Sequence, residues 1–255
     1  ASRSVVHACR AARCFRRPPM PRILVTALLL AAALLQPAAA KTAPPETVQA
    51  EYGLSVNGSP IAVMQETFEI RDGGYRAVSE THAVGLFALA QRRPGRVTSS
   101  GTVDASGLRP KTFDAARGGR DDRRVQADFD WNARTLTLQH DGRNDTVALP
   151  PGAQDRLSAM YQFLFLDAEK LRSLGFAMTN GRKLDQYRYA IGPDTAIDTP
   201  LGRLEVIHLV RQHQPGETAN EIWLARDHRL MPVKMRIVED DGKRYEQVIS
   251  RLDIR

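Results

Sequence analysis

The chain has 255 residues and a formal charge of +7, which by itself suggests an anionic partner. That surplus comes from the start of the chain: residues 1–40 contain six arginines and no acidic residue, which leaves 30 basic and 29 acidic side chains in the rest. A nearly neutral chain lacks the clustered cations that bind a phosphate backbone, so a nucleic-acid-binding protein is excluded.

Residues 20–40 have the three parts of a secretory signal peptide. Met20 and Arg22 precede an uncharged apolar run from Ile23 to Leu35, and small residues follow up to Ala40. The apolar run is shorter than the about 20 residues that a membrane-spanning helix needs. We therefore expect cleavage after Ala40 and a periplasmic mature chain without a transmembrane span. An uncleaved membrane anchor is the alternative.

Four parts are expected along the chain. Residues 1–19 are basic and precede the first Met, and we interpret them as an upstream extension from a misplaced start site. The signal peptide follows, then a short extended lead-in at residues 41–47 and a single β-rich domain at residues 48–255. Both cysteines, Cys9 and Cys14, lie in the extension, so thiolate metal sites and cysteine nucleophiles are excluded from the domain.

Alternation of apolar and polar residues predicts strands with one buried face from Val48 onward. Between these strands lie pairs of residues that tolerate positive φ, as hairpin turns require. We count about ten strands and predict a mainly β fold, with one antiparallel curved sheet or open half-barrel. The predicted inward positions are Ala62, Met64, Phe68 and Ile70; Val125, Ala127, Phe129 and Trp131; Tyr187, Tyr189 and Ile191; Met231, Val233, Met235 and Ile237. The predicted turns are Asn57-Gly58, Asp72-Gly73-Gly74, Asp141-Gly142, Asn180-Gly181 and Asp241-Gly242.

One segment changes from strand to helix periodicity. After Pro150-Pro151-Gly152, Asp155 is placed to cap a first turn, and apolar residues then recur every three or four positions up to Phe165. We expect one amphipathic helix over about residues 155–168, with the sheet wrapped around its apolar face.

Motifs that would carry catalysis or bind a cofactor are missing. The five histidines after residue 40 have no zinc-ligand spacing, and no nucleophile elbow, phosphate loop or dinucleotide-binding turn occurs. Asp128 and Asp130 alternate with apolar residues and indicate the wet face of a strand. We therefore predict a protein that is not an enzyme and has no cofactor or metal. An envelope hydrolase that uses carboxylates such as Asp128 and Asp130 is the alternative.

Apolar surface is the remaining candidate for function. Such residues either fill an ordinary core or line an apolar groove between sheet and helix, since small exported β-barrels hold one ligand in this way. The sequence does not separate these two interpretations, because core and cavity walls use the same residue types. The candidate groove residues are Leu157, Met160, Tyr161, Leu164, Phe165, Tyr187, Tyr189 and Trp223.

The order of short motifs resembles the bacterial exported proteins grouped as domain-of-unknown-function family 3108. The motifs are Y-x-L-x-V-N-G-x-P at residues 52–60, S-x-G-x-V-x-x-x-G-L-x-P at 99–110, P-P-G-x-Q-D-x-L-S at 150–158, T-P-L-G at 199–202, and I-W-L-A-R-D with L-M-P-V at 222–233. The resemblance covers about residues 52–252 and implies no catalytic residue. It implies a β-plus-helix plan similar to the half-barrel of Lol-type lipoprotein carriers, which is an analogy of fold.

Two functional hypotheses follow. The first is a non-enzymatic periplasmic protein that binds lipid or lipoprotein acyl chains in the apolar groove. The second is a structural or interaction protein of the cell envelope that binds a protein partner through a sheet edge or a surface patch.

Overall fold

Strands make up most of the chain that the computed structural model describes, which is residues 44–255 without residues 90, 92, 117, 119–123 and 215. The expected extension and signal peptide lie outside this part. The strands are β1 (Thr47–Val56), β2 (Ser59–Arg71), β3 (Gly74–Ala83), β4 (Gly95–Asp104), β5 (Gly107–Ala116), β6 (Val125–Asp130), β7 (Thr135–His140), β8 (Arg143–Ala148), β9 (Gln154–Asp155), β10 (Leu174–Thr179), β11 (Leu184–Ile191), β12 (Thr195–Thr199), β13 (Gly202–Arg211), β14 (Ala219–Ala225), β15 (Met231–Val238) and β16 (Arg244–Ile254).

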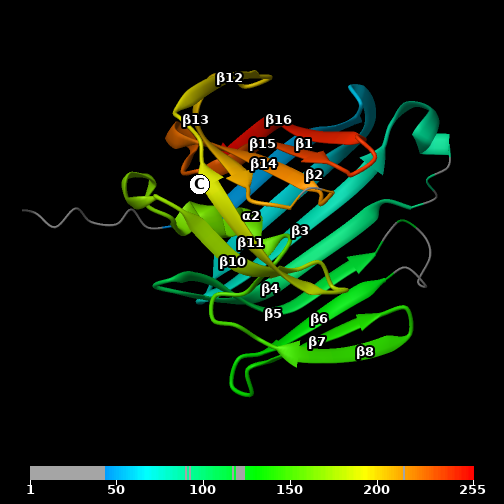
Figure 1. Ribbon diagram of the computed structural model, residues 1–255, viewed down its shortest axis with the longest axis vertical. Coiled ribbons are helices and arrows are strands. Elements are labelled where there is room, and N and C mark those ends of the chain that lie inside the picture. Colours follow the sequence, from blue (N-terminus) through cyan, green and yellow to red (C-terminus); the bar gives the residue numbers. More distant parts are fainter. Residues whose placement is uncertain (1–43, 90, 92, 117, 119–123, 215) are drawn as a thin grey trace, which may run out of the picture. The chain divides into compact units, whose positions relative to one another are not determined.

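All sixteen strands belong to one open sheet, which runs in the order β8-β7-β6-β5-β4-β3-β2-β1-β16-β15-β14-β13-β11-β10-β9, with β12 added beside β13 (Figure 1). Most neighbours are consecutive in the chain and antiparallel; the pair β9 and β10 is parallel. Pairing of β1 with β16 joins the two ends of the described chain inside the sheet. The predicted mainly β fold and single curved sheet are thus confirmed.

The predicted number of about ten strands is wrong. Two of the additional strands have no alternation to detect: all six residues of β8 are exposed, and β9 has only two residues. A strand exposed on both faces can carry polar residues throughout, so the period-two pattern disappears.

Turn chemistry fixes the register where the sequence predicts it. Asn57-Gly58, Asp72-Gly73 and Asp141-Gly142 each have positive φ at both positions and join neighbouring strands by two residues. Two-residue hairpin loops of this kind need positive φ twice, which Asn, Asp and Gly tolerate best. Because a slip of one residue would turn every inward side chain outward, these turns also decide which residues form the core.

Helical structure is brief and lies against the sheet. Helix α2 (Ser158–Gln162) continues directly into the 3-10 turn η4 (Phe163–Phe165), and we call these eight residues the helical segment. Further 3-10 turns are η2 (Gly85–Leu89), η5 (Ala168–Lys170) and η6 (Arg226–His228). In the described part of the chain, no helix is long and apolar enough to cross a membrane.

The predicted helix at about residues 155–168 is therefore too long at both ends. Gln154 and Asp155 instead pair with β10 as strand β9. At the other end, Leu166 has extended dihedral angles, which stops the helical segment. The apolar spacing predicted the helical residues correctly, but it carries no information about a neighbouring strand that captures the first residues.

The core includes many of the predicted inward positions. Phe68, Val125, Ala127, Met231 and Val233 are buried. Met64, Ile70, Met235 and Ile237 are half-buried. One cluster joins β1–β3, β14–β16 and the helical segment, a second lies over β5–β7, and a third covers β13 and β14. The face of the sheet that carries the helical segment is called the inner face below.

Candidate functional site

The helical segment fills the inner face of the sheet. Tyr161 is fully buried and stacks on Phe68 of β2, with ring centroids 4.5 Å apart and planes 6° from parallel. Leu157, Leu164 and Phe165 belong to the same core cluster, whereas Phe163 packs on the cluster of β13 and β14. The segment is therefore held from both halves of the sheet.

A carboxylate lies beneath Tyr161. Glu66 points inward from β2 and is buried, and it accepts a hydrogen bond from the Tyr161 hydroxyl at 3.0 Å. Burial raises the pKa of Glu66, while the hydrogen bonds from Tyr161 and Ser79 partly oppose that rise. The sequence analysis did not single out Glu66. The pattern that could have identified it is its inward position between Met64 and Phe68, where an alternating strand has apolar residues.

A second buried carboxylate fixes the start of the helical segment. Asp155 accepts hydrogen bonds from the backbone N–H groups of Leu157 and Ser158 at 2.9 and 2.8 Å, as its predicted capping role requires. Its other oxygen accepts a 2.6 Å hydrogen bond from the Ser99 hydroxyl of β4. Burial raises the pKa of Asp155, and these hydrogen bonds oppose the rise. Asp155 thus ties the segment to the inner face.

Glu66 and Asp155 connect the helical segment to the sheet. Both are hydrogen-bonded to side chains of the sheet or the helical segment, and neither lines any of the three cavities described below. A general acid or base must reach the proton that it transfers. Glu66 and Asp155 instead offer buried anchors under the segment.

Of the eight candidate groove residues, Tyr187 borders one of the three cavities described below, and the others lie in or against core clusters. Leu157, Tyr161, Leu164, Phe165 and Trp223 belong to one core cluster. Tyr189 belongs to another cluster, and Met160 and Tyr187 pack against that cluster. Trp223 lies on β14, where the His208 ring stacks on it at 4.5 Å.

A small apolar groove runs beside the helical segment. It has a volume of about 160 Å³, and its walls include Phe163, Leu166, Leu174 and Phe176. Phe176 stacks against both Tyr187 and Tyr189, at 6.4 and 6.1 Å between ring centroids. Ligand pockets usually enclose about 300 Å³ or more, so this groove holds only part of a ligand while the segment stays in place.

Asp128 and Asp130 line an open depression of about 600 Å³ beside Trp131. Both are exposed, as predicted for the wet face of β6. Asp130 accepts hydrogen bonds from the backbone N–H groups of Asn132 and Ala133, which assigns it to the following turn. No group of three or more residues able to hold a metal occurs among the described residues.

The largest of the three cavities lies where the sheet splits between β11 and β13. It has a volume of about 820 Å³ and is bordered by β11, the loop between β13 and β14, and the end of β15; we call it the β11 opening. Only Tyr189, Ala190 and Ile191 of β11 pair with β13, because β13 ends at Arg211. The first half of β11 therefore has no strand neighbour on this side in the part of the chain that the structure describes.

Backbone groups face the β11 opening. The Gln212 N–H donates to the Arg188 carbonyl at 2.8 Å and the Gly192 N–H to the His208 carbonyl at 2.7 Å, which shows that even-numbered residues of β11 point their backbone groups toward β13. Antiparallel pairs alternate in this way along a strand. The N–H and C=O groups of Gln186 accordingly point to the side where β13 is missing.

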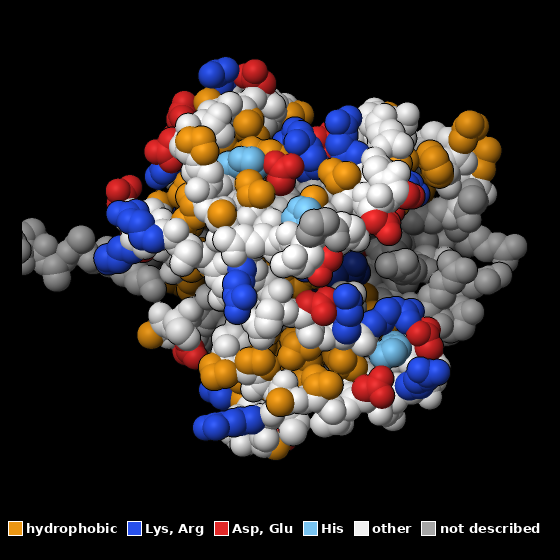
Figure 2. Space-filling model, in the orientation of Figure 1, with side chains coloured by type: hydrophobic (Ala, Val, Ile, Leu, Met, Phe, Trp, Pro, Cys, Tyr) orange, Lys and Arg blue, Asp and Glu red, His pale blue; other side chains and the backbone are white. Residues whose placement is uncertain are grey.

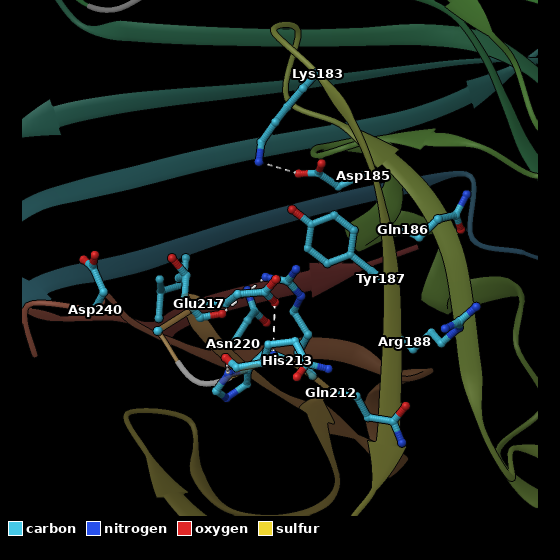
Figure 3. A pocket seen from close by; sticks show the side chains of 15 residues that line it. Lys183, Asp185, Gln186, Tyr187, Arg188, Gln212, His213, Glu217, Asn220 and Asp240 are labelled. Atoms are coloured by element: carbon cyan, nitrogen blue, oxygen red, sulfur yellow. Dashed lines mark hydrogen bonds and ion pairs between the residues drawn. The ribbon is translucent and has the colours of Figure 1, made fainter.

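Side chains add an anchor beside this free edge. Figure 3 shows Asp185 and Tyr187 pointing from β11 toward the side of His213 and Asn220, while Gln186 points away. The Arg211 guanidinium lies 4.6 Å from the Tyr187 ring centroid and donates to the Thr218 carbonyl at 3.2 Å. Its Nε atom is buried without a hydrogen-bond partner among the described residues.

Acidic and basic groups balance around the β11 opening. Its charged lining residues comprise three cations and three carboxylates, Lys183, Arg188, Arg211, Asp185, Glu217 and Asp240. Lys183 and Asp185 form an ion pair at 2.8 Å. Burial is the main cause of a raised pKa at Tyr187, with the Asp185 charge second. A balanced lining of this kind suits a polar but uncharged ligand surface such as a polypeptide backbone.

Comparison with solved structures gives distant likenesses. A candidate exported protein with a YmcC-like fold from Bacteroides fragilis is 11% identical with a TM-score of 0.36, over 82% of this chain and 96% of that one. A candidate lipoprotein from Parabacteroides distasonis is 10% identical with a TM-score of 0.33, over 82% and 95%. MucB in complex with MucA is 12% identical with a TM-score of 0.15, over 81% and 88%. All three scores are too low to support a conclusion about this chain.

Family assignment rests on sequence. No curated protein matches the chain. The model of a family described as protein of unknown function, DUF3108, matches residues 47–248, which is nearly all of the described sheet. The chain belongs to the DUF3108 family, as the order of its motifs predicted.

Proposed function

We propose that this protein is an exported, non-enzymatic protein of the cell envelope that binds an extended segment of a partner polypeptide at the β11 opening. The observation that carries the proposal is the free backbone edge at Gln186, beside a cavity of about 820 Å³. An extended peptide adds to such an edge through main-chain hydrogen bonds, and side-chain pockets next to the edge give specificity. The signal-peptide features of residues 20–40 support a periplasmic location.

Tyr187 and Arg211 supply the expected anchor. Tyrosine and arginine are enriched among residues that dominate binding energy, and here they are already stacked on one another. The stack places the Tyr187 ring and the Arg211 guanidinium together beside the edge at Gln186, where a bound segment would contact them.

The test separates backbone pairing from side-chain contact. A photo-reactive residue replaces exposed Glu217 at the rim, in cells that express the full chain with Gln186→Ala or Gln186→Pro. Alanine keeps the backbone N–H of residue 186, and proline removes it at an edge position that tolerates proline. We expect one dominant protein adduct with Gln186→Ala and its loss with Gln186→Pro. An equal adduct in both variants, or none in either, contradicts strand addition.

The second candidate function is acyl-chain binding beside the helical segment. The observation that favours it is the apolar groove at Phe163 and Phe176, which adjoins the candidate residues Tyr187 and Tyr189. An acyl chain longer than this groove requires the segment to move away from Glu66. Native mass spectrometry of protein purified from the periplasm tests this function, which predicts a co-purified lipid. A lipid-free spectrum, together with unchanged tryptophan fluorescence on addition of fatty acid, contradicts it.

A further inference from the structure

Turn η2, between β3 and β4, carries exposed apolar side chains. Leu86, Phe87 and Leu89 are 83, 56 and 86% exposed, and they are three of the five large hydrophobic residues that are exposed in the described chain. Figure 2 shows hydrophobic side chains gathered at the upper right of this face, where η2 lies in Figure 1. Single exposed apolar residues are ordinary, whereas a contiguous set marks a site of interaction. We call these three residues the apolar tip.

The base of the apolar tip is fastened to the sheet. The Gln91 side chain accepts from the Ala83 N–H and donates to the Thr81 carbonyl at 3.0 Å, both on β3. The Val84 N–H donates to the Ile61 carbonyl of β2 at 2.9 Å. The exposed leucines therefore project from a fixed platform, and their exposure is built into the fold.

Positive charge follows the apolar tip in the sequence. From Thr81 to Val103 the chain contains Arg92, Arg93 and Arg96 and no acidic residue. Arg93 is exposed and makes no ion pair with another described residue, while Arg96 pairs with Glu80. Apolar residues next to cations match the interface of an anionic bilayer, where the acyl boundary lies just below negative headgroups.

We propose that the apolar tip inserts into the surface of an anionic lipid bilayer and thereby docks the protein on a membrane. Charge complementarity favours this occupant, because exposed Arg93 makes no ion pair with another described residue and anionic headgroups supply one. A protein interface of standard size also buries about 800 Å² on each partner, which a projecting tip of three side chains does not offer, whereas membrane insertion needs no such area. This inference is independent of peptide binding at the β11 opening.

The experiment places a fluorescent reporter in the tip of the full chain. Phe87→Trp is compared with Val147→Trp, a control at another exposed apolar residue on β8, and wild type gives the background from Trp131 and Trp223. Each protein is mixed with two kinds of vesicle, one of phosphatidylcholine alone and one of phosphatidylcholine with phosphatidylglycerol. In both kinds, the acyl chains of the phosphatidylcholine carry bromine as a quencher. We expect a blue shift and quenching of the reporter in Phe87→Trp with phosphatidylglycerol, and neither change in Val147→Trp. Because the reporters are local, a contribution of residues 1–40 to binding does not imitate this result.

Two further variants test the apolar and the electrostatic contribution to membrane binding separately, by vesicle sedimentation. Leu86→Ser with Leu89→Ser should weaken binding to phosphatidylglycerol vesicles roughly tenfold or more, since apolar burial is lost. Arg93→Glu should weaken it roughly tenfold and make the remaining binding less sensitive to salt.

Three fluorescence results overturn the proposal: an unquenched reporter in Phe87→Trp, equal quenching of that reporter in both vesicle types, or quenching in Val147→Trp to the same extent. A photo-reactive residue at position 87 that cross-links to a protein, when vesicles do not bind, overturns it as well.

Discussion

The inner face under the helical segment and the β11 opening treat polar groups in opposite ways. Under the segment, Glu66 and Asp155 are buried and each accepts hydrogen bonds from defined donors. At the β11 opening, the backbone edge at Gln186 borders a cavity, and the buried Arg211 Nε has no hydrogen-bond partner among the described residues. The first region has satisfied its polar groups within the chain, whereas the second leaves the backbone edge at Gln186 beside a cavity.

This difference indicates at which of the two sites a ligand binds with the smaller free-energy cost. A ligand that enters under the helical segment must break the Tyr161 hydrogen bond and expose Glu66 without a donor, and an unsatisfied buried group costs about 1–3 kcal/mol. A strand that enters the β11 opening meets the N–H and C=O groups of Gln186 on the side where β13 is missing. The comparison therefore favours the β11 opening, and the experiments below test it from the largest expected effect to the smallest.

Removing the Tyr161 side chain should have the largest effect on stability. Tyr161→Ala loses the stack on Phe68 and leaves a cavity next to Glu66. Large-to-small changes of buried aromatic residues cost about 3–5 kcal/mol, and we expect a loss near the upper end. The free energy of unfolding in urea measures it.

Tyr161→Phe is the matched control for this experiment. It keeps the stack and removes only the hydroxyl, so Glu66 loses a donor and we expect a loss of about 1–2 kcal/mol. If Tyr161→Ala costs no more than Tyr161→Phe, the segment does not fill the inner face as described, and the contrast with the β11 opening fails.

Glu66→Gln should change how stability depends on pH. Burial holds the folded-state pKa of Glu66 above its ordinary value of 4.5, so the protonated form is favoured in the folded protein. Its contribution is then complete below pH 4.5 and is lost as the pH rises through the folded-state pKa. Glutamine cannot ionise, so the variant should gain stability relative to wild type as the pH rises.

Urea unfolding of both proteins at about pH 5 and about pH 8 gives this difference. Taking the difference cancels the contribution of Asp155, whose pKa is also raised by burial. A constant difference between the two pH values would show that Glu66 is ionised to the same extent in the folded and unfolded chains. Its burial would then not separate the inner face from the β11 opening.

Local chemistry explains which parts of the fold were predictable. Asn57-Gly58 and Asp141-Gly142 each form a hairpin turn through the positive φ of their own two residues. Asp155 accepts a hydrogen bond from the backbone N–H group of Leu157, two residues later. Such features depend on neighbours in the chain, so sequence reasoning finds them. Strands that alternation misses, such as β8 and β9, are recognised only from their partners in the sheet.

The candidate site was less predictable for the same reason. Tyr187 was singled out as an aromatic residue, but its role beside Arg211 depends on where β13 ends relative to β11. Glu66 was visible as a charge at an inward position, although its partner Tyr161 is 95 residues away. Long-range pairing decides both, and period-two alternation does not encode it.

Arg211→Met should have the smallest effect on stability. The variant loses the contact with Tyr187 and the hydrogen bond to Thr218, but it also removes an Nε atom that has no partner among the described residues. These changes partly offset each other, and a cation–π contact at a partly exposed site contributes about 0.5–1 kcal/mol. We expect a loss below about 1 kcal/mol in urea unfolding, together with loss of the protein adduct at the β11 opening.

Arg211→Lys serves as its control, since lysine keeps the charge without the planar group that stacks on tyrosine. It should reduce the adduct as Arg211→Met does, because the stack and not the charge positions Tyr187. A loss of stability above about 3 kcal/mol for Arg211→Met would instead place Arg211 among the structural groups of the core. The side chains at the β11 opening would then stabilise the fold as those of the inner face do. The free edge at Gln186 would be a consequence of packing and would not favour binding there.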